Sequence, residues 1–152
     1  MSTEKYKSIA SKLKFEGRAY INGKYVDAVD GEKFETINPA SGDILCSVAK
    51  CNQKDVDLAV QSSRKAFDSG VWSRTSPEHR KEVLLKFAKL LSKEGEENSV
   101  LESVDTGKLI VDCINEVAND APMHFQWYGE LIDKVFGKVG PTDPSITSLV
   151  VK

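Results

Sequence analysis

The sequence has few of the residues that mark secreted, membrane-bound or metal-binding proteins. It contains three cysteines, an odd number that fits no metal or redox spacing, so reduced thiols in the cytoplasm are the simplest interpretation. No apolar run approaches the length that spans a bilayer, and residues 1–17 lack the continuous apolar core of a secretory signal. We therefore expect a cytoplasmic protein with no membrane partner.

An excess of one charge sign is also missing. The formal net charge is −2, and the basic residues are spread along helical faces instead of forming one run. Neither nucleic acid nor an anionic membrane surface is therefore expected as a partner. Glycines stand singly at turns and helix ends, so no glycine-rich loop brings backbone amides close to a phosphate.

The residues that are present describe an ordinary globular chain. With 152 residues, 40% of them hydrophobic and 29% charged, the sequence can bury a core and form about one domain. Tyr6, Ile9, Ala10 and Leu13 have the spacing of a short amphipathic helix that would lie on the body.

Strand and turn signals fill the first third of the chain. Asn22-Gly23 lies between two β-prone runs and predicts a tight hairpin over 18–27, because both turn residues favour positive φ. After a turn at Asp30-Gly31, two further strands are expected over 33–37 and 44–49, joined by a proline-containing loop.

A helix is expected next, beginning after Asn52 and ending at Gly70. Asn52 and Asp55 have the spacing of a capping box. The predicted buried stripe of this helix consists of Val56, Ala59, Val60 and Phe67. Trp72 is expected to anchor the following loop between two helical layers.

A long helical stretch from Pro77 to Phe136 organises the remainder. Gly95 and Gly107 are expected to end successive helices in the left-handed conformation. Pro122 must either kink the last helix or break it, with Asn119 or Asp120 capping a new one, and the break is favoured. We interpret the apolar residues spaced three or four apart, together with the Phe125, Trp127 and Tyr128 group, as core and not as a substrate box.

The chain closes on a predicted strand over 145–152. It is rich in apolar residues, and no later element is available to pair with it. An open apolar edge of this kind invites association, and the chain is expected to be cut off, not finished. Strands, helices and a lone terminal strand make an α+β arrangement.

Side chains that could carry chemistry lack recognisable partners. A cysteine nucleophile needs a basic neighbour or a helix start to lower its pKa. Cys46 lies within a strand pattern, Cys113 within a helical one, and Cys51 precedes the cap with no base beside it. We interpret these cysteines, and likewise His79 and His124, as packing or surface residues.

Asp120 is the acid most worth weighing. It stands beside Pro122, where the long helix should be interrupted. One interpretation is a helix cap. The other is a carboxylate at a cleft mouth that attracts a cationic substrate. The two are compatible.

Several motifs resemble the opening of NAD(P)-dependent aldehyde dehydrogenases, in the same order and spacing over 18–152. They are Tyr20-Ile21-Asn22-Gly23, the run from Thr36 to Asp43, Trp72-Ser73, Arg80 with Val83-Leu84, and the run from Leu101 to Lys108. Residues 119–122, 127–128 and 132–137 most resemble the branch of this family that acts in polyamine breakdown, the γ-glutamyl-γ-aminobutyraldehyde dehydrogenases. Leu109 departs from the pattern, because proline usually stands there.

The resemblance implies a part of the α/β aldehyde dehydrogenase fold. Residues 1–17 would be an extension, 18–140 the N-terminal part of the cofactor-binding domain, and 141–152 the start of an oligomerisation arm. The complete enzyme would be a homo-oligomer that oxidises aldehydes with NAD or NADP through a cysteine thiohemiacetal, helped by a glutamate base and an asparagine donor. In the family these residues and most of the cofactor crevice lie beyond this segment. The chain is therefore expected to hold no catalytic residue, to bind no cofactor tightly and to be inactive alone.

Two site assignments follow from the resemblance. In relatives that oxidise aminoaldehydes, an acid at the position of Asp120 meets the amino group of the substrate. Some relatives also hold a monovalent cation with a backbone oxygen near Ile37 and with Asp105. The competing hypothesis is a self-standing, non-catalytic α+β module that pairs with a partner through its terminal strand.

Overall fold

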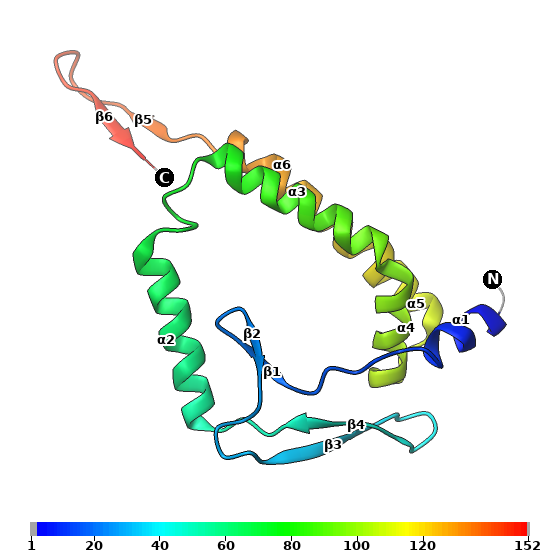
Figure 1. Ribbon diagram of the computed structural model, residues 1–152. Helices are drawn as coiled ribbons and strands as arrows, with labels where there is room; N and C mark the ends of the chain where they lie inside the picture. Colours follow the sequence, from blue (N-terminus) through cyan, green and yellow to red (C-terminus); the bar gives the residue numbers. More distant parts are fainter. Residues whose placement is uncertain (1–2, 152) are drawn as a thin grey trace.

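The computed structural model describes residues 3–151 and has the predicted α+β composition (Figure 1). Its first half consists of α1 (Thr3–Ala10), β1 (Ala19–Ile21), β2 (Lys24–Val26), β3 (Lys33–Ile37), β4 (Ile44–Ala49) and α2 (Gln53–Ser69). Its second half consists of α3 (Pro77–Lys93), α4 (Gly95–Thr106), α5 (Ile110–Cys113), a π-helical segment (Ile114–Asp120), α6 (Ala121–Leu131), a 3-10 turn (Ile132–Lys134), β5 (Lys138–Gly140) and β6 (Ser148–Val150). The strands pair antiparallel as β1–β2, β3–β4 and β5–β6.

The predicted hairpins are confirmed. Asn22 and Gly23 both have positive φ, 53° and 75°, as the tight turn between β1 and β2 requires. Tyr20 and Tyr25 face each other across this hairpin with their rings edge to face at 5.1 Å. The pair β3–β4 occupies the predicted ranges, with a register shift between Thr36 and Ile37.

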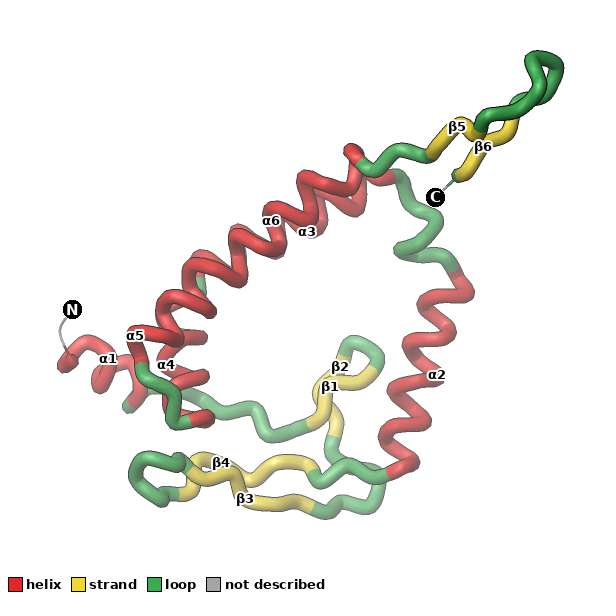
Figure 2. Tube along the Cα trace, turned by 180° about the vertical axis from the view of Figure 1, so that it is seen from behind, coloured by secondary structure: helices red, strands yellow, loops and turns green. Residues whose placement is uncertain are grey.

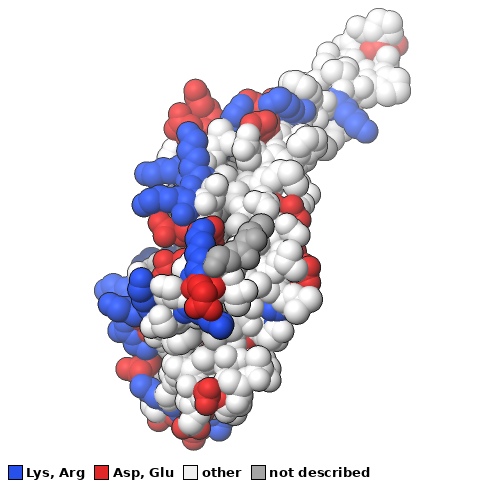
Figure 3. Space-filling view, turned by 90° about the vertical axis from the view of Figure 1, so that its right-hand side faces the viewer, with Lys and Arg blue, Asp and Glu red and all other residues white. Residues whose placement is uncertain are grey.

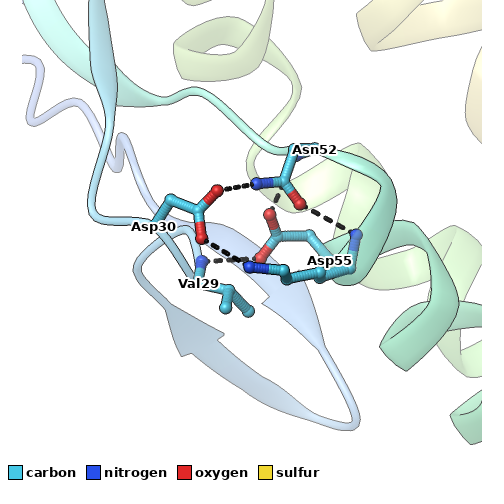
Figure 4. Close-up of polar contacts among 5 residues, drawn as sticks. Val29, Asp30, Asn52 and Asp55 are labelled. Atoms are coloured by element: carbon cyan, nitrogen blue, oxygen red, sulfur yellow. Dashed lines mark hydrogen bonds and ion pairs between the residues drawn. The ribbon is translucent and has the colours of Figure 1, made fainter.

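The predicted capping box at the start of α2 is confirmed. The Asn52 side chain accepts the Lys54 amide at 2.8 Å, and the Asp55 carboxylate accepts the Asn52 amide at 2.8 Å. Asp55 also accepts the Val29 amide at 2.8 Å, so the loop after β2 is tied to the first turn of α2 (Figure 4). At the other end Gly70 adopts the left-handed conformation that was expected.

The buried stripe predicted for α2 is wrong. Val60 and Phe67 are 59% and 64% exposed, and Val56 is also exposed. The reason is the arrangement of the elements: α2 stands apart from the α3–α6 pair, so no helix covers this face (Figures 1 and 2). Trp72 is 44% exposed for the same reason, so it does not anchor a loop between two packed helical layers.

The packed part of the molecule lies around α3, α4 and α6. Helices α3 and α6 lie side by side, with Ala88 of α3 and Gly129 of α6 buried between them (Figures 1 and 2). The rings of Phe87 and Phe125 meet edge to face at 4.7 Å. The predicted N-terminal helix is present as α1, which packs on α4 and places Lys5 Nζ 2.5 Å from Glu96.

Gly95 does not end a helix in the left-handed conformation, so that prediction is wrong. Helix α3 ends at Lys93 with Glu94 as its C-cap, and Gly95 is the buried first residue of α4. A Cβ atom at Gly95 would lie 2.9 Å from the Cα and Cβ atoms of Ala118. Glycine is therefore required here for close packing, not for a turn. Gly107 does end α4 with a φ of 77°, as expected.

The terminal strand is shorter than predicted and is not unpaired. Strand β6 pairs with β5 in the register Lys138 to Val150, and the two form a ribbon that projects from the body (Figure 1). The sequence reasoning missed β5 because a three-residue strand shows no alternating pattern. Lys152, at the end of the predicted strand, lies outside the described residues.

The elements form an open frame, not a closed body (Figure 1). The accessible surface is 11386 Å², whereas a compact protein of this mass has about 7,700 Å². The buried hydrophobic residues in the described part are correspondingly small: Ala28, Ala49, Ala88, Val100 and Cys113. Figure 3 shows charged side chains along one margin of the face that carries α1, beside a largely uncharged middle. The fold therefore leaves a large area open to contact.

Candidate functional site

Asp120 is the last residue of the π-helical segment and is exposed. Its carboxylate has no hydrogen bond or ion pair among the described residues. Its backbone oxygen lies 2.8 Å from His124 Nδ1, so this ring nitrogen carries the hydrogen. Asp120 therefore presents an uncompensated negative charge at the junction between the π-helical segment and α6.

The predicted break before Pro122 is wrong. The backbone runs from α5 through the π-helical segment into α6 without leaving helical dihedral angles, and neither Asn119 nor Asp120 caps a new helix. Proline has no N–H group, so a regular α-helix would leave the carbonyl four residues earlier unpaired. The wider π turn redistributes the backbone bonds over this stretch, and such segments often mark functional sites.

Glu116 lies four residues before Asp120 in the same π-helical segment, and the sequence analysis did not single it out. It forms an ion pair with Lys108, and the hydrogen bond to Glu116 raises the pKa of the Lys108 ammonium group. The charge of Glu116 is thus compensated from within the chain. Of the two acids of this segment, only Asp120 has a charge left for an external cation.

Ile37 and Asp105 belong to segments that the structure brings together. The hydroxyl of Thr36, beside Ile37 on β3, donates to Asp105 Oδ1 at 3.2 Å. The Cβ position of Gly107 lies 2.9 Å from Pro39, so the end of α4 also touches the loop after β3. No group of three histidine, cysteine, aspartate or glutamate side chains within residues 3–151 could hold a metal ion. A cation site at Ile37 and Asp105 stays a prediction.

The two candidate sites are separate. Asp120 lies near the start of α4, where Gly95 meets Ala118, whereas Asp105 lies near its end. Ten residues of α-helix separate those two points, which is about 15 Å. A substrate held at Asp120 would therefore not share its contacts with a cation at Asp105.

The three thiols differ in exposure. Cys113 is fully buried, and burial raises the pKa of its thiol above the ordinary value. Cys46 is half-buried in β4, and Cys51 is exposed just before the cap of α2. No hydrogen bond in the described residues links either sulfur to a base. For Cys113 these conditions are the opposite of what a nucleophile needs, a lowered pKa and an open approach.

The aromatic group on α6 is divided between core and surface. Phe125 packs on Phe87, but Trp127 and Tyr128 are 65% and 60% exposed. The interpretation of these two as core is wrong, because both remain exposed and α3 packs against Gly129 instead. The exposed histidines His79 and His124 agree with a surface role.

Side chains already occupy part of the first turn of two helices, α2 and α3. The Asn52 side chain accepts one amide of α2, that of Lys54, and the Ser76 hydroxyl accepts one amide of α3, that of His79. The first turn of α4 carries Glu96 and Glu97, which would repel a phosphate.

No helix in residues 3–151 is long and apolar enough to cross a membrane.

The family model described as "Aldehyde dehydrogenase family" matches residues 25–152. Among characterised proteins, aminoacetaldehyde dehydrogenase of Pseudomonas aeruginosa is 38% identical over 152 residues, which is 100% of this chain and 31% of the relative. The NADP/NAD-dependent aldehyde dehydrogenase PuuC of Escherichia coli is 38% identical over 94% of this chain and 29% of its own length. The chain thus spans about a third of the length of these relatives.

Solved structures give the same fold. Indole-3-acetaldehyde dehydrogenase of P. syringae, in complex with NAD+ and IAA, matches with a TM-score of 0.92 and 40% identity, over 98% of this chain and 30% of that one. Gamma-glutamyl-gamma-aminobutyraldehyde dehydrogenase of Burkholderia cenocepacia matches with a TM-score of 0.90 and 40% identity, over 94% and 29%. Identity at this level, extending over nearly all of the chain, indicates a relationship in sequence as well as a similar fold.

Proposed function

The chain belongs to the aldehyde dehydrogenase family, and from that premise we propose that it forms the N-terminal part of an enzyme that oxidises aminoaldehydes to carboxylic acids with NAD or NADP. Two similar proteins are named for nitrogen-containing aldehydes, aminoacetaldehyde and γ-glutamyl-γ-aminobutyraldehyde. Others are named for NAD or NADP or were solved with NAD+. These names support both the reaction class and the cofactor.

One observation in the chain carries the choice of substrate class. The Asp120 carboxylate is exposed and has no partner in the described residues, whereas neighbouring Glu116 is paired with Lys108. A substrate ammonium group would supply the missing partner, because a charge-assisted hydrogen bond is about twice as strong as a neutral one. Asp120 is the proposed substrate-binding residue.

The 152 residues by themselves are proposed to be inactive. The buried thiol of Cys113 and the unassisted thiols of Cys46 and Cys51 supply no nucleophile. The cysteine that forms the thiohemiacetal, and most of the cofactor contacts, belong to residues outside this segment. The working enzyme is proposed to act in the cytoplasm.

The proposed division of labour follows the elements. Residues 18–140 form part of the cofactor-binding domain, with residues 1–17 as an extension that packs through α1. Residues 141–152 begin an arm that joins identical subunits, and the exposed apolar residues of the β5–β6 ribbon support this. Ile37 and Asp105 contribute to a monovalent cation site, supported by the contact of Thr36 with Asp105.

The test uses a fusion of residues 1–152 with the remainder of the P. aeruginosa aminoacetaldehyde dehydrogenase. Its substrates are aminoacetaldehyde and propanal, which match in size and differ in charge. We expect Asp120→Asn to lower kcat/KM for aminoacetaldehyde by about tenfold or more, as the loss of one hydrogen bond to a charged group predicts. The value for propanal should stay within about twofold.

Two controls accompany this comparison. Asp112→Asn removes an exposed acid from α5 and should leave both substrates unaffected. Residues 1–152 alone should give no turnover with NAD, and turnover that depends on one of their cysteines would contradict the proposal. Equal losses on both substrates in Asp120→Asn would return Asp120 to a structural role.

A second candidate function is a non-catalytic module that pairs with a partner through its terminal strand. It is favoured by the exposure of Leu149 and Val151 on a two-stranded ribbon. Such a strand offers unpaired backbone groups along its free edge. Activity of the fusion would exclude this function as the main one.

A further inference from the structure

We infer that Gly95 and Ser99 of α4 are positioning residues that lock the π-helical segment Ile114–Asp120 in the conformation in which Asp120 faces the substrate amine. This inference rests on the proposed function and deepens it, because it names what holds the specificity residue. It is carried by contacts at the two ends of the π-helical segment.

The first contact lies where the segment begins. Ser99 has no exposed surface, and its hydroxyl lies 2.7 Å from the Gly95 oxygen and 3.1 Å from the Cys113 oxygen. Cys113 is fully buried and directly precedes the π-helical segment. The hydroxyl proton is therefore shared between the backbone of α4 and the residue from which the π turn starts.

The second contact lies near the end of the segment. The backbone of Gly95 packs so closely on Ala118 that an added Cβ atom would lie 2.9 Å from both Cα and Cβ of Ala118. Ala118 stands two residues before Asp120 in the sequence. Its backbone is the neighbour that must shift, because a backbone atom cannot rotate away as the end of a side chain can.

Together the two contacts fix the register of the segment. Successive residues of an α-helix are rotated by about 100° around its axis. If the π turn relaxed to α-helical geometry, the last residues of the segment and those after it would turn around the axis by an angle of that order. Asp120 would then leave its position, although its chemistry would be unchanged. The position of Asp120 can therefore be tested separately from its carboxylate, because a change in backbone register moves the residue without altering the side chain.

The experiment uses the fusion described above and measures the ratio of kcat/KM for aminoacetaldehyde to that for propanal. Gly95→Ala should lower this ratio about fivefold or more, toward the ratio of Asp120→Asn. Ser99→Ala, which removes one hydroxyl and adds no atom, should lower it about threefold. The loss should appear mainly in KM for aminoacetaldehyde, because the amine contact positions the substrate.

The matched control is Gly129→Ala. Gly129 is also a buried helical glycine, and its Cβ position lies 3.2 Å from Leu84 of α3, away from the π-helical segment. This substitution should change stability without changing the ratio by more than about twofold. A ratio equally lowered in Gly129→Ala would mean that general loosening, and not the lock, sets specificity.

A second measurement does not depend on activity. In the fusion, Gly95→Ala should speed amide hydrogen exchange of residues 114–120 about tenfold or more over the parent fusion, and Gly129→Ala should not. Unchanged exchange would overturn the inference. So would an unchanged substrate ratio in Gly95→Ala while Asp120→Asn lowers it. An unchanged ratio in Asp120→Asn itself would instead refute the proposed substrate class, and the positioning role with it.

Discussion

At the scale of single residues, Asp55 shows how one carboxylate can join two parts of a chain. Its two oxygens accept amides from Asn52 and from Val29, and its side chain is only 2% exposed. Around it, Asp30 accepts from the Asn52 side-chain amide and pairs with Lys54 at 3.1 Å (Figure 4). The capping box could be predicted from four consecutive residues, because its geometry is local. The bond to Val29, 26 positions away, could not.

Asp55→Asn tests this joint through its pH dependence. The amides of Asn52 and then of Val29 hold the pKa of the Asp55 carboxyl below its ordinary value. The carboxylate therefore stabilises the fold above about pH 4, and this contribution is lost as pH falls through the lowered pKa. The variant should unfold at lower urea than the parent at pH 7, and the gap should shrink toward pH 3.

The charged neighbours of Asp55 in this comparison are Lys54 and Asp30, and both remain in the variant. Asp57→Asn, an exposed acid on the same helix bonded to Gln53, is the control and should track the parent. If the difference in unfolding urea concentration between the parent and Asp55→Asn were the same at every pH, the stabilising effect of these amides would not depend on the charge of the carboxylate.

At the scale of elements, the helices were predicted in the right places but not with the right faces. The apolar spacing of the last helix assumed a single period of 3.6 residues, and the π-helical segment changes that register. Gly129 is consequently buried where Tyr128 was expected. Pro122 indicated a disturbance in the helix, but Gly95 packs on the π-helical segment at Ala118, 23 positions away, and no local pattern reveals that contact.

Gly107 at the end of α4 and Gly42 in the β3–β4 loop allow two costs to be measured apart. One is the cost of a left-handed backbone, and the other is the cost of a steric clash. Gly107 and Gly42 have nearly equal φ, 77° and 78°, but only Gly107 has a neighbour, Pro39 at 2.9 Å from its Cβ position. Gly42→Ala should cost about 1–2 kcal/mol of unfolding free energy, the usual cost of this conformation. Gly107→Ala should cost at least about 1 kcal/mol more.

Urea unfolding of the two glycine variants measures both costs. Equal losses would mean that the end of α4 and the loop do not press on each other, and the contact that brings Thr36 to Asp105 would lose its support.

At the scale of the whole molecule, the pattern of strands and helices correctly predicted an α+β chain, but not how its elements are spread. The apolar face of α2 looks like a core face in sequence, because a pattern records what a residue prefers and not what stands opposite. The family motifs were informative for a different reason, since they depend on order and spacing and not on burial.

Removal of residues 141–152 tests whether the projecting ribbon is an arm. Within the described chain β6 packs on β5, and the ribbon makes few other contacts. We expect the truncated chain to keep its unfolding free energy within about 0.5 kcal/mol and to elute from size exclusion with less self-association. Removal of residues 1–13, which include the helix packed on α4, should instead destabilise the body. An unfolded product of the first truncation would refute the arm.

The unusually large accessible surface has a thermodynamic consequence. Burying apolar area is the main force that offsets the entropy of ordering a chain, and this frame withdraws little of its area from water. Whatever surface covers α2 and the ribbon contributes to the same balance that decides whether the frame is ordered at all. For these residues, acquiring a shape and acquiring a neighbour are a single equilibrium.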